Sequence, residues 1–134
     1  MSEVTTERAM PEPGSLTLAQ ILANLAHPVP DRLHSEKSTG KFKATYTHHA
    51  VIRDLLDRRA PGWEWRVSIQ GVDGKLYVIG TLTVVGSDGR ISRDGAGNEE
   101  SDLDGYGDPS SNAEAKALRR AAMAFGLDRS LWRK

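Results

Sequence analysis

Apolar residues recur at helical spacing in two stretches of the N-terminal half, and both are predicted to be helices buried on one side. The first spans residues 16–26, with Ser15 as its N-cap, and ends at the His27-Pro28-Val29-Pro30 segment because proline cannot continue a helix. The second spans residues 48–59, with Thr47 as its N-cap, and ends at Pro61-Gly62. Residues 31–39 are polar and are predicted to form a loop, followed by a short strand over 41–46.

Alternation of apolar and polar residues in the middle of the chain predicts a β-meander. Trp63, Trp65, Val67 and Ile69 alternate with polar residues, which predicts a strand with one buried and one wet face and assigns both tryptophans to the core. A turn at 71–74 leads to a strand over 75–85, and a turn at 87–89 leads to a third strand over 90–96. Residues 95–112 are predicted to be a glycine-rich, acidic connection.

The last helix, predicted from residue 112 to 125, separates apolar residues from cations. A capping box at 111–114 precedes it, and Gly126 stands where a left-handed C-cap residue belongs. On a helical wheel one face is apolar, comprising Ala115, Leu118, Ala121, Ala122 and Phe125. The opposite side carries Lys116, Arg119, Arg120 and Met123. Three cations without a carboxylate among them suit an anionic polymer, although a solvated helix face has the same pattern.

The predicted order of elements, α-β-α-β-β-β-α, indicates one α+β domain over residues 15–134, with an antiparallel β-meander and helices packed on one face. Residues 1–14 are predicted to be a disordered tail. The chain has no cysteine, which excludes disulfides, thiolate metal sites and cysteine nucleophiles. No apolar run reaches the roughly 18 residues of a membrane span, and no signal peptide is evident. We therefore expect a cytoplasmic protein with no membrane partner.

The charges balance in number but not in position. The chain has 18 Lys and Arg and 18 Asp and Glu, for a formal net charge of zero. Residues 94–108 hold six acids and no base, namely Asp94, Glu99, Glu100, Asp102, Asp104 and Asp108. Residues 113–134 hold six bases against two acids. Such segregation allows a neutral protein to present a cationic surface to nucleic acid.

Several segments, taken in order, resemble the single-strand annealing domain of the Rad52 superfamily. They read TYTHHAVIRDLLDRRAPGW, WRV, GKLYVIGTLTV, DGAG and AEAKALRRAAMAFG. The likeness covers residues 16–132 and is greatest to DdrA-type bacterial DNA-damage-response proteins. It implies a Rad52-like annealing fold that assembles into an oligomeric ring. It also implies sequence-independent binding of single-stranded DNA, protection of DNA ends (3′ ends in particular) and strand annealing. The resemblance implies no catalytic activity, cofactor or metal. It does imply that the protein is located with the nucleoid.

The resemblance carries DNA-binding roles onto particular residues. Arg119 and Arg120 match the basic pair of the family's last helix, and His49 falls where relatives carry an arginine beside the phosphates. Arg53 shares the exposed face of His49, but it also stands four residues before Asp57, so an ion pair competes with DNA binding. Further candidates are Lys116, on the cationic side of the last helix, and Lys41 and Lys43, which also suit a guarded edge strand.

Two other classes of function remain open from the residues alone. The acidic run could hold magnesium and make the protein a metal-dependent nuclease. Alternatively, the domain could be an α+β interaction module that does not bind nucleic acid.

Overall fold

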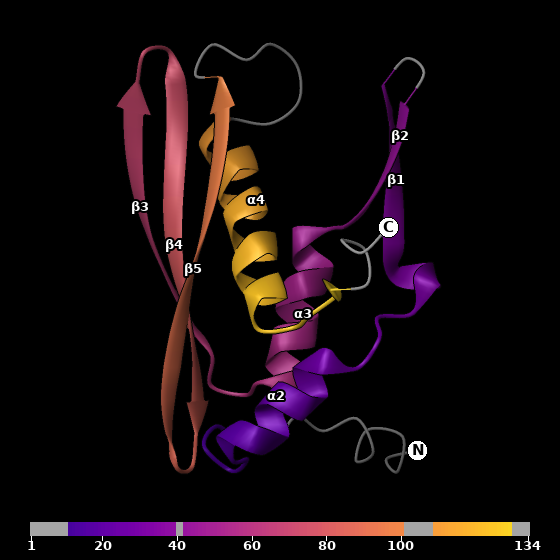
Figure 1. Ribbon diagram of the computed structural model, residues 1–134, viewed down its shortest axis with the longest axis vertical. Coiled ribbons are helices and arrows are strands. Elements are labelled where there is room, and N and C mark those ends of the chain that lie inside the picture. The colour runs from indigo at the N-terminus through magenta and orange to yellow at the C-terminus, as the bar shows by residue number, and fades with distance from the viewer. Residues whose placement is uncertain (1–10, 40–41, 101–108, 130–134) are drawn as a thin grey trace, which may run out of the picture.

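The computed structural model describes residues 11–39, 42–100 and 109–129, and in this part of the chain a three-stranded sheet carries helices on one face (Figure 1). Strands β3 (Glu64–Val72), β4 (Lys75–Gly86) and β5 (Gly89–Glu100) pair antiparallel in the order β3-β4-β5. Asp73 and Gly74, with φ of 51° and 76°, form the two-residue turn between β3 and β4. The predicted meander is therefore confirmed.

Helix α4 (Pro109–Ala124) packs along β5 and β4 and forms the centre of the core. Leu118, Ala121, Ala122 and Phe125 are buried, as the helical wheel predicts, whereas Ala115 is only partly buried. Ala113 and Ala117 are buried too and form a smaller cluster with Val78 of β4. One side of the helix is therefore alanine-rich and faces the sheet at close range.

Strand β5 is longer than predicted, since residues 95–100 continue the strand instead of forming a connection. Two of its glycines permit the close approach of α4. A Cβ atom at Gly95 would lie 2.3 Å from the carbonyl oxygen of Ala117, and one at Gly97 would lie 2.2 Å from that of Ala113. Glycine lowers strand propensity, which made this segment resemble a loop, but here it allows two backbones to touch.

The two ends of α4 compare differently with the prediction. The capping box at 111–114 is wrong, because the helix begins at Pro109 and residues 111–114 lie inside it; proline is well suited to the first helical position. The C-terminal prediction is confirmed, since Gly126 has a φ of 104°. Its N–H donates to the carbonyl of Met123, and the N–H of Leu127 donates to that of Ala122, which together form a Schellman motif.

Helices α2 (Leu18–Ala26) and α3 (His49–Arg59) were predicted correctly, but not their caps. Thr17, rather than Ser15, caps α2 in a reciprocal capping box with Gln20. His48, rather than Thr47, caps α3, and its Nδ1 accepts the N–H of Ala50 at 3.2 Å. Thr47 is buried instead, where its hydroxyl serves a tertiary contact.

The predicted loop over 31–39 is wrong, because most of it is a strand. A single 3-10 turn (Asp31–Leu33) leads into β1 (His34–Thr39), which pairs antiparallel with β2 (Phe42–Thr47). The β1–β2 hairpin stands apart from the three-stranded sheet, on the far side of α3 and α4 (Figure 1). Its first strand is polar throughout, so alternation of apolar residues could not reveal it.

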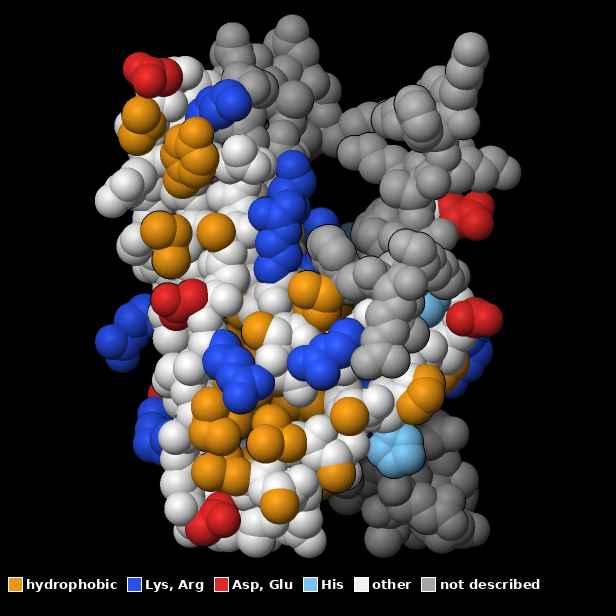
Figure 2. Space-filling model, viewed as in Figure 1, with side chains coloured by type: hydrophobic (Ala, Val, Ile, Leu, Met, Phe, Trp, Pro, Cys, Tyr) orange, Lys and Arg blue, Asp and Glu red, His pale blue; other side chains and the backbone are white. Residues whose placement is uncertain are grey.

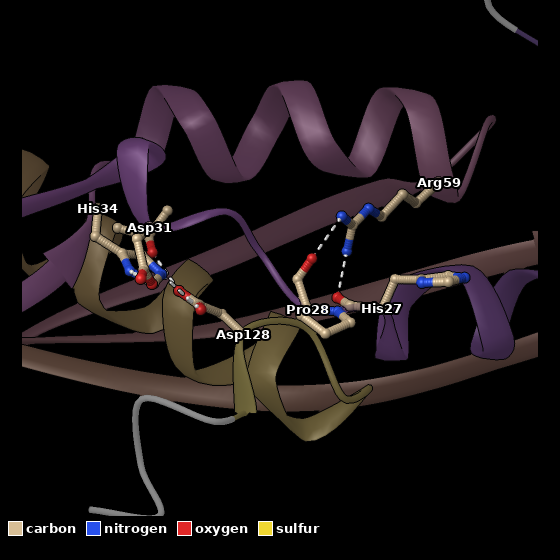
Figure 3. Close-up of polar contacts among 7 residues, drawn as sticks. His27, Pro28, Asp31, His34, Arg59 and Asp128 are labelled. Atoms are coloured by element: carbon tan, nitrogen blue, oxygen red, sulfur yellow. Dashed lines mark hydrogen bonds and ion pairs between the residues drawn. The ribbon is translucent and has the colours of Figure 1, made fainter.

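A buried carboxylate fixes the base of this hairpin to the segment after α4 (Figure 3). Asp128 is 6% exposed and accepts a hydrogen bond from the Thr47 hydroxyl, while His34 Nε2 lies 3.0 Å from its Oδ1. His34 Nδ1 lies 3.7 Å from the exposed carboxylate of Asp31. We call His34, Thr47 and Asp128 the hairpin anchor.

A second set of contacts in Figure 3 ties α3 to the segment after α2. Arg59 donates to the carbonyl of His27 at 2.8 Å and to that of Pro28 at 3.4 Å. Partial burial lowers the pKa of Arg59, and the nearby Asp128 opposes that shift. Among the described helices, none combines the length and hydropathy that a membrane crossing requires.

Candidate nucleic-acid interface

Five of the predicted DNA-binding residues lie on α3 and α4, which contact each other beside the sheet. Arg53 of α3 faces Glu114 of α4, with 3.4 Å between Nη2 and Oε2. The same carboxylate oxygen accepts the indole N–H of Trp65 at 2.9 Å. Glu114 therefore joins α3, α4 and β3 at one point.

The competing ion pair predicted for Arg53 is not the one that forms. Asp57 instead accepts the indole N–H of Trp63 at 2.7 Å, and the Arg53 guanidinium lies 5.9 Å from the centre of the Trp63 ring. Both Trp63 and Trp65 are partly buried against the core, as predicted. The Trp63 ring therefore lies beside Arg53, and the indole N–H of each tryptophan is bound to a carboxylate.

His49 is exposed at the start of α3, and its lowered pKa leaves the ring mostly neutral at pH 7. Partial desolvation lowers its pKa below the ordinary value of 6.5, and the positive charges of His48, Arg53 and Arg119 lower it further, with Glu114 opposing them. The rings of His48 and His49 lie 4.4 Å apart. His49 thus lies within the electrostatic reach of Arg119, which places that arginine on the α3 side of α4.

The other two cations of α4 lie on the β5 side. Arg120 is exposed and donates to the carbonyl oxygen of Ala96 at 2.7 Å, and Lys116 Nζ donates to that of Asn98 at 3.1 Å. The cationic face of the wheel is therefore divided, with Arg119 toward α3 and Lys116 and Arg120 along the seam between α4 and β5. Figure 2 shows Lys and Arg side chains gathered over this region of the molecule.

Comparison with known proteins places this architecture in a family. The chain is 33% identical over 131 residues to "DNA repair RAD52-like protein 1, mitochondrial" of Arabidopsis thaliana, covering 95% of this chain and 74% of that protein. The chain belongs to the RAD52-like family. It is also 33% identical over 115 residues to "DNA repair RAD52-like protein 2, chloroplastic" of the same plant, covering 82% of this chain and 58% of that protein. No protein-family model matches the sequence.

The α+β architecture, with its three-stranded antiparallel sheet and helices, is compatible with a RAD52-like fold. Both relatives are plant proteins, so the predicted likeness to the DdrA type stays a prediction.

Several predicted features of the RAD52-like chain fall wholly or partly outside the described residues, and these include residues 1–10 of the predicted tail. Lys41 lies in one of the gaps, and Lys43 is placed only by its backbone in β2, paired with Ser38. Within the acidic segment 94–108, residues 101–108 lie outside the described residues. Asp94, at the start of that segment, accepts a hydrogen bond from the Thr81 hydroxyl at 2.7 Å. Within the described ranges, no three His, Asp or Glu side chains converge as metal ligands would.

Two arginines at the end of α4 were not among the predicted site residues. Arg93 of β5 donates to the carbonyl oxygen of Ala124 at 2.7 Å, and its guanidinium lies 4.8 Å from the centre of the Phe125 ring. Arg129 Nη2 lies 3.4 Å from the carbonyl oxygens of Met123 and Ala124. Alternation along β5 puts Arg93 on the same face as Gly95 and Gly97, which was the only sequence signal for its position.

Proposed function

We propose that this RAD52-like protein binds single-stranded DNA without regard to sequence, in DNA repair and recombination, and acts without catalytic chemistry. The observation that carries the proposal is the state of Arg120. Its guanidinium is anchored by a neutral carbonyl, and no carboxylate of the described residues pairs with it. An arginine held in this way keeps its full charge and its remaining N–H donors for a phosphate.

The binding mechanism follows from phosphate chemistry. Arg119, Arg120 and Lys116 neutralise phosphates and release their counterions, and so do Arg53 and Lys41 or Lys43. His49, neutral at pH 7, offers a hydrogen bond rather than a charge. Contacts to phosphate carry no base information, so the affinity does not depend on sequence.

A single protomer offers few cations, so the proposal includes a homo-oligomeric ring. Repeating the same surface around a ring adds weak contacts through effective concentration. DNA held along such a track has ends, 3′ ends in particular, that are shielded from exonucleases. If the protein grips only the backbone, the base edges stay open to a complementary strand, which permits annealing. We place this activity at the nucleoid in the cytoplasm.

The test is a fluorescence anisotropy titration of a labelled thymidine oligonucleotide with the full chain. The double variant Arg119→Ala, Arg120→Ala should lose at least about tenfold in affinity, because it removes two phosphate contacts. Arg90→Ala is the matched control, since Arg90 is an exposed arginine already paired with Glu64 on the far face of the sheet. Equal binding by the double variant and the wild type would contradict the proposal and favour the interaction module.

Two further measurements separate the remaining alternatives. Incubation of the oligonucleotide with protein and magnesium, with and without an added 3′→5′ exonuclease, should leave full-length DNA in both cases. Cleavage by the protein alone would instead support the nuclease. Light scattering with and without DNA should give the mass of an oligomer, whereas a monomer in both conditions contradicts the ring.

A further inference from the structure

Two guanidinium groups converge on one atom at the C-terminal end of α4. Arg93 reaches the carbonyl oxygen of Ala124 from β5 at 2.7 Å, and Arg129 reaches the same oxygen from the segment after the helix at 3.4 Å. Arg129 also approaches the Met123 carbonyl. Two like charges are thus held close together by an acceptor that they share.

No carboxylate in the described part of the chain neutralises this pair. Asp94, the neighbour of Arg93, points to the other face of the sheet and binds Thr81. Asp128, the neighbour of Arg129, is buried in the hairpin anchor. The partial negative charge at a helix C-terminus is about half a unit, so it offsets only part of two full charges.

The pair keeps most of its hydrogen-bonding capacity. A guanidinium has five N–H donors, and the carbonyl bonds of each arginine occupy a minority of them. Both arginines are exposed, and Phe125, which lies beneath Arg93, is 3% exposed and fixes that side chain without covering it. Two fixed guanidinium forks around one point are the arrangement that favours a tetrahedral oxyanion.

The pair is continuous with the cations already described. Arg120 lies one helical turn, about 5.4 Å, before Ala124 and reaches across to Ala96 of β5, while Arg93 reaches from β5 to Ala124. These two contacts, one in each direction between α4 and β5, place the guanidiniums of Arg93 and Arg120 along the seam between the two elements. Figure 2 shows Lys and Arg side chains near the C-terminal end of α4 as well as over its middle.

We propose that Arg93 and Arg129 together bind one backbone phosphate of the single-stranded DNA that contacts Arg120. The DNA path then follows the seam between α4 and β5 and passes over the C-terminal end of α4. This inference rests on the proposed function. It adds Arg93 and Arg129 to the binding surface that the α4 cations supply, and it gives the direction in which the DNA crosses that surface.

The test compares full-length variants by anisotropy with a labelled thymidine oligonucleotide over a series of salt concentrations. Each phosphate contact to a single strand contributes about 0.7 to the slope of log K against log salt, or about fivefold in affinity at 0.1 M salt. Arg93→Gln with Arg129→Gln should therefore lower the slope by about 0.7 for each protomer on the DNA. Arg90→Gln, on the same strand but on the opposite face and paired with Glu64, should leave it unchanged.

A structural role for Arg93 is tested separately, because its bond to Ala124 could stabilise the helix end. Arg129→Gln alone loses only the two contacts at 3.4 Å, so it should fold as the wild type does and still lower the slope. A slope equal to that of the wild type in both variants overturns the inference. So does an equal loss in Arg90→Gln, since it would mean that any cation suffices.

The outcomes also distinguish this inference from the proposed function. If the wild type does not bind the oligonucleotide, both are wrong. If Arg119→Ala with Arg120→Ala weakens binding while Arg93→Gln with Arg129→Gln does not, the proposed function stands and the path over the end of α4 is wrong.

Discussion

Gly95→Ala should destabilise the protein strongly, because α4 and β5 touch through their backbones at this position. The added Cβ would lie 2.3 Å from the Ala117 carbonyl oxygen, 2.5 Å from the Ala121 nitrogen and 2.9 Å from the Ala121 Cβ. Carbon atoms at van der Waals contact lie about 3.5–4.0 Å apart, so the helix has to move by about 1 Å. All but one of these close atoms belong to the backbone, so a side-chain rotation cannot relieve them.

The magnitude follows from the usual effects of overpacking. Extra methyl groups in a packed core destabilise by about 1–3 kcal/mol, and the backbone clash places Gly95→Ala at the upper end, about 3 kcal/mol. With a urea m-value of about 2 kcal/mol/M, the midpoint of unfolding should fall by about 1.5 M. Urea denaturation at one fixed protein concentration measures this shift.

Gly71→Ala is the matched control on the edge strand β3. Its Cβ would meet nothing closer than 3.8 Å, at Leu76 Cδ2, and its φ lies outside the left-handed region. Alanine costs less conformational entropy than glycine, so this variant should be neutral or more stable by about 0.5 kcal/mol. If the midpoints of Gly95→Ala and Gly71→Ala differ by less than about 0.3 M, then α4 does not pack on β5 at backbone contact.

Three further predictions concern the site and the hairpin anchor. Because the pKa of His49 is lowered, the ring gains its positive charge only as the pH falls below 6.5, and DNA affinity should rise as it does so. In anisotropy titrations, His49→Gln should abolish that rise. A wild-type affinity that does not depend on pH refutes this prediction. Glu114→Gln removes the carboxylate facing Arg53, so it should increase DNA affinity about two- to fivefold with a steeper salt slope; weaker binding in a folded variant would speak against Arg53 as a DNA contact. Asp128→Ala strands the buried Thr47 hydroxyl and should destabilise by about 2–3 kcal/mol in urea, whereas a change under 0.5 kcal/mol would show that the hairpin anchor is dispensable.

The parts of the fold that bury one regular face could be predicted from the sequence. Alternation around Trp65 indicated β3, and the spacing of Leu118 and Phe125 indicated the buried face of α4. The failures share a physical cause, which is that the deciding partner is distant in sequence. From the sequence alone, Gly95 and Gly97 suggest a loop, because nothing local shows that α4 packs against them. The polar strand β1 is held in place by the contact of His34 with the distant Asp128.

The candidate site was predictable only in part, for the same reason. Arg119 and Arg120 follow from helical periodicity and the family resemblance, and the family is confirmed. Periodicity could not show that Arg119 lies toward α3 while Arg120 lies toward β5, because that depends on how α4 packs between those two elements. Alternation along β5 was the only sequence signal for Arg93, and Arg129 had none, since only the helix end between them brings the two arginines together.

The hairpin anchor has a consequence for the order in which the chain folds. Its contacts join residues 94 and 81 positions apart, His34 to Asp128 and Thr47 to Asp128. Closing loops of that size is entropically unfavourable, so such contacts form late, after local helices and hairpins. The β1–β2 hairpin can pair early but docks only once α4 has settled on the sheet and its Schellman turn has set Asp128 in place. Folding kinetics should therefore show the attachment of the first hairpin as the last step, governed by a residue near the other end of the chain.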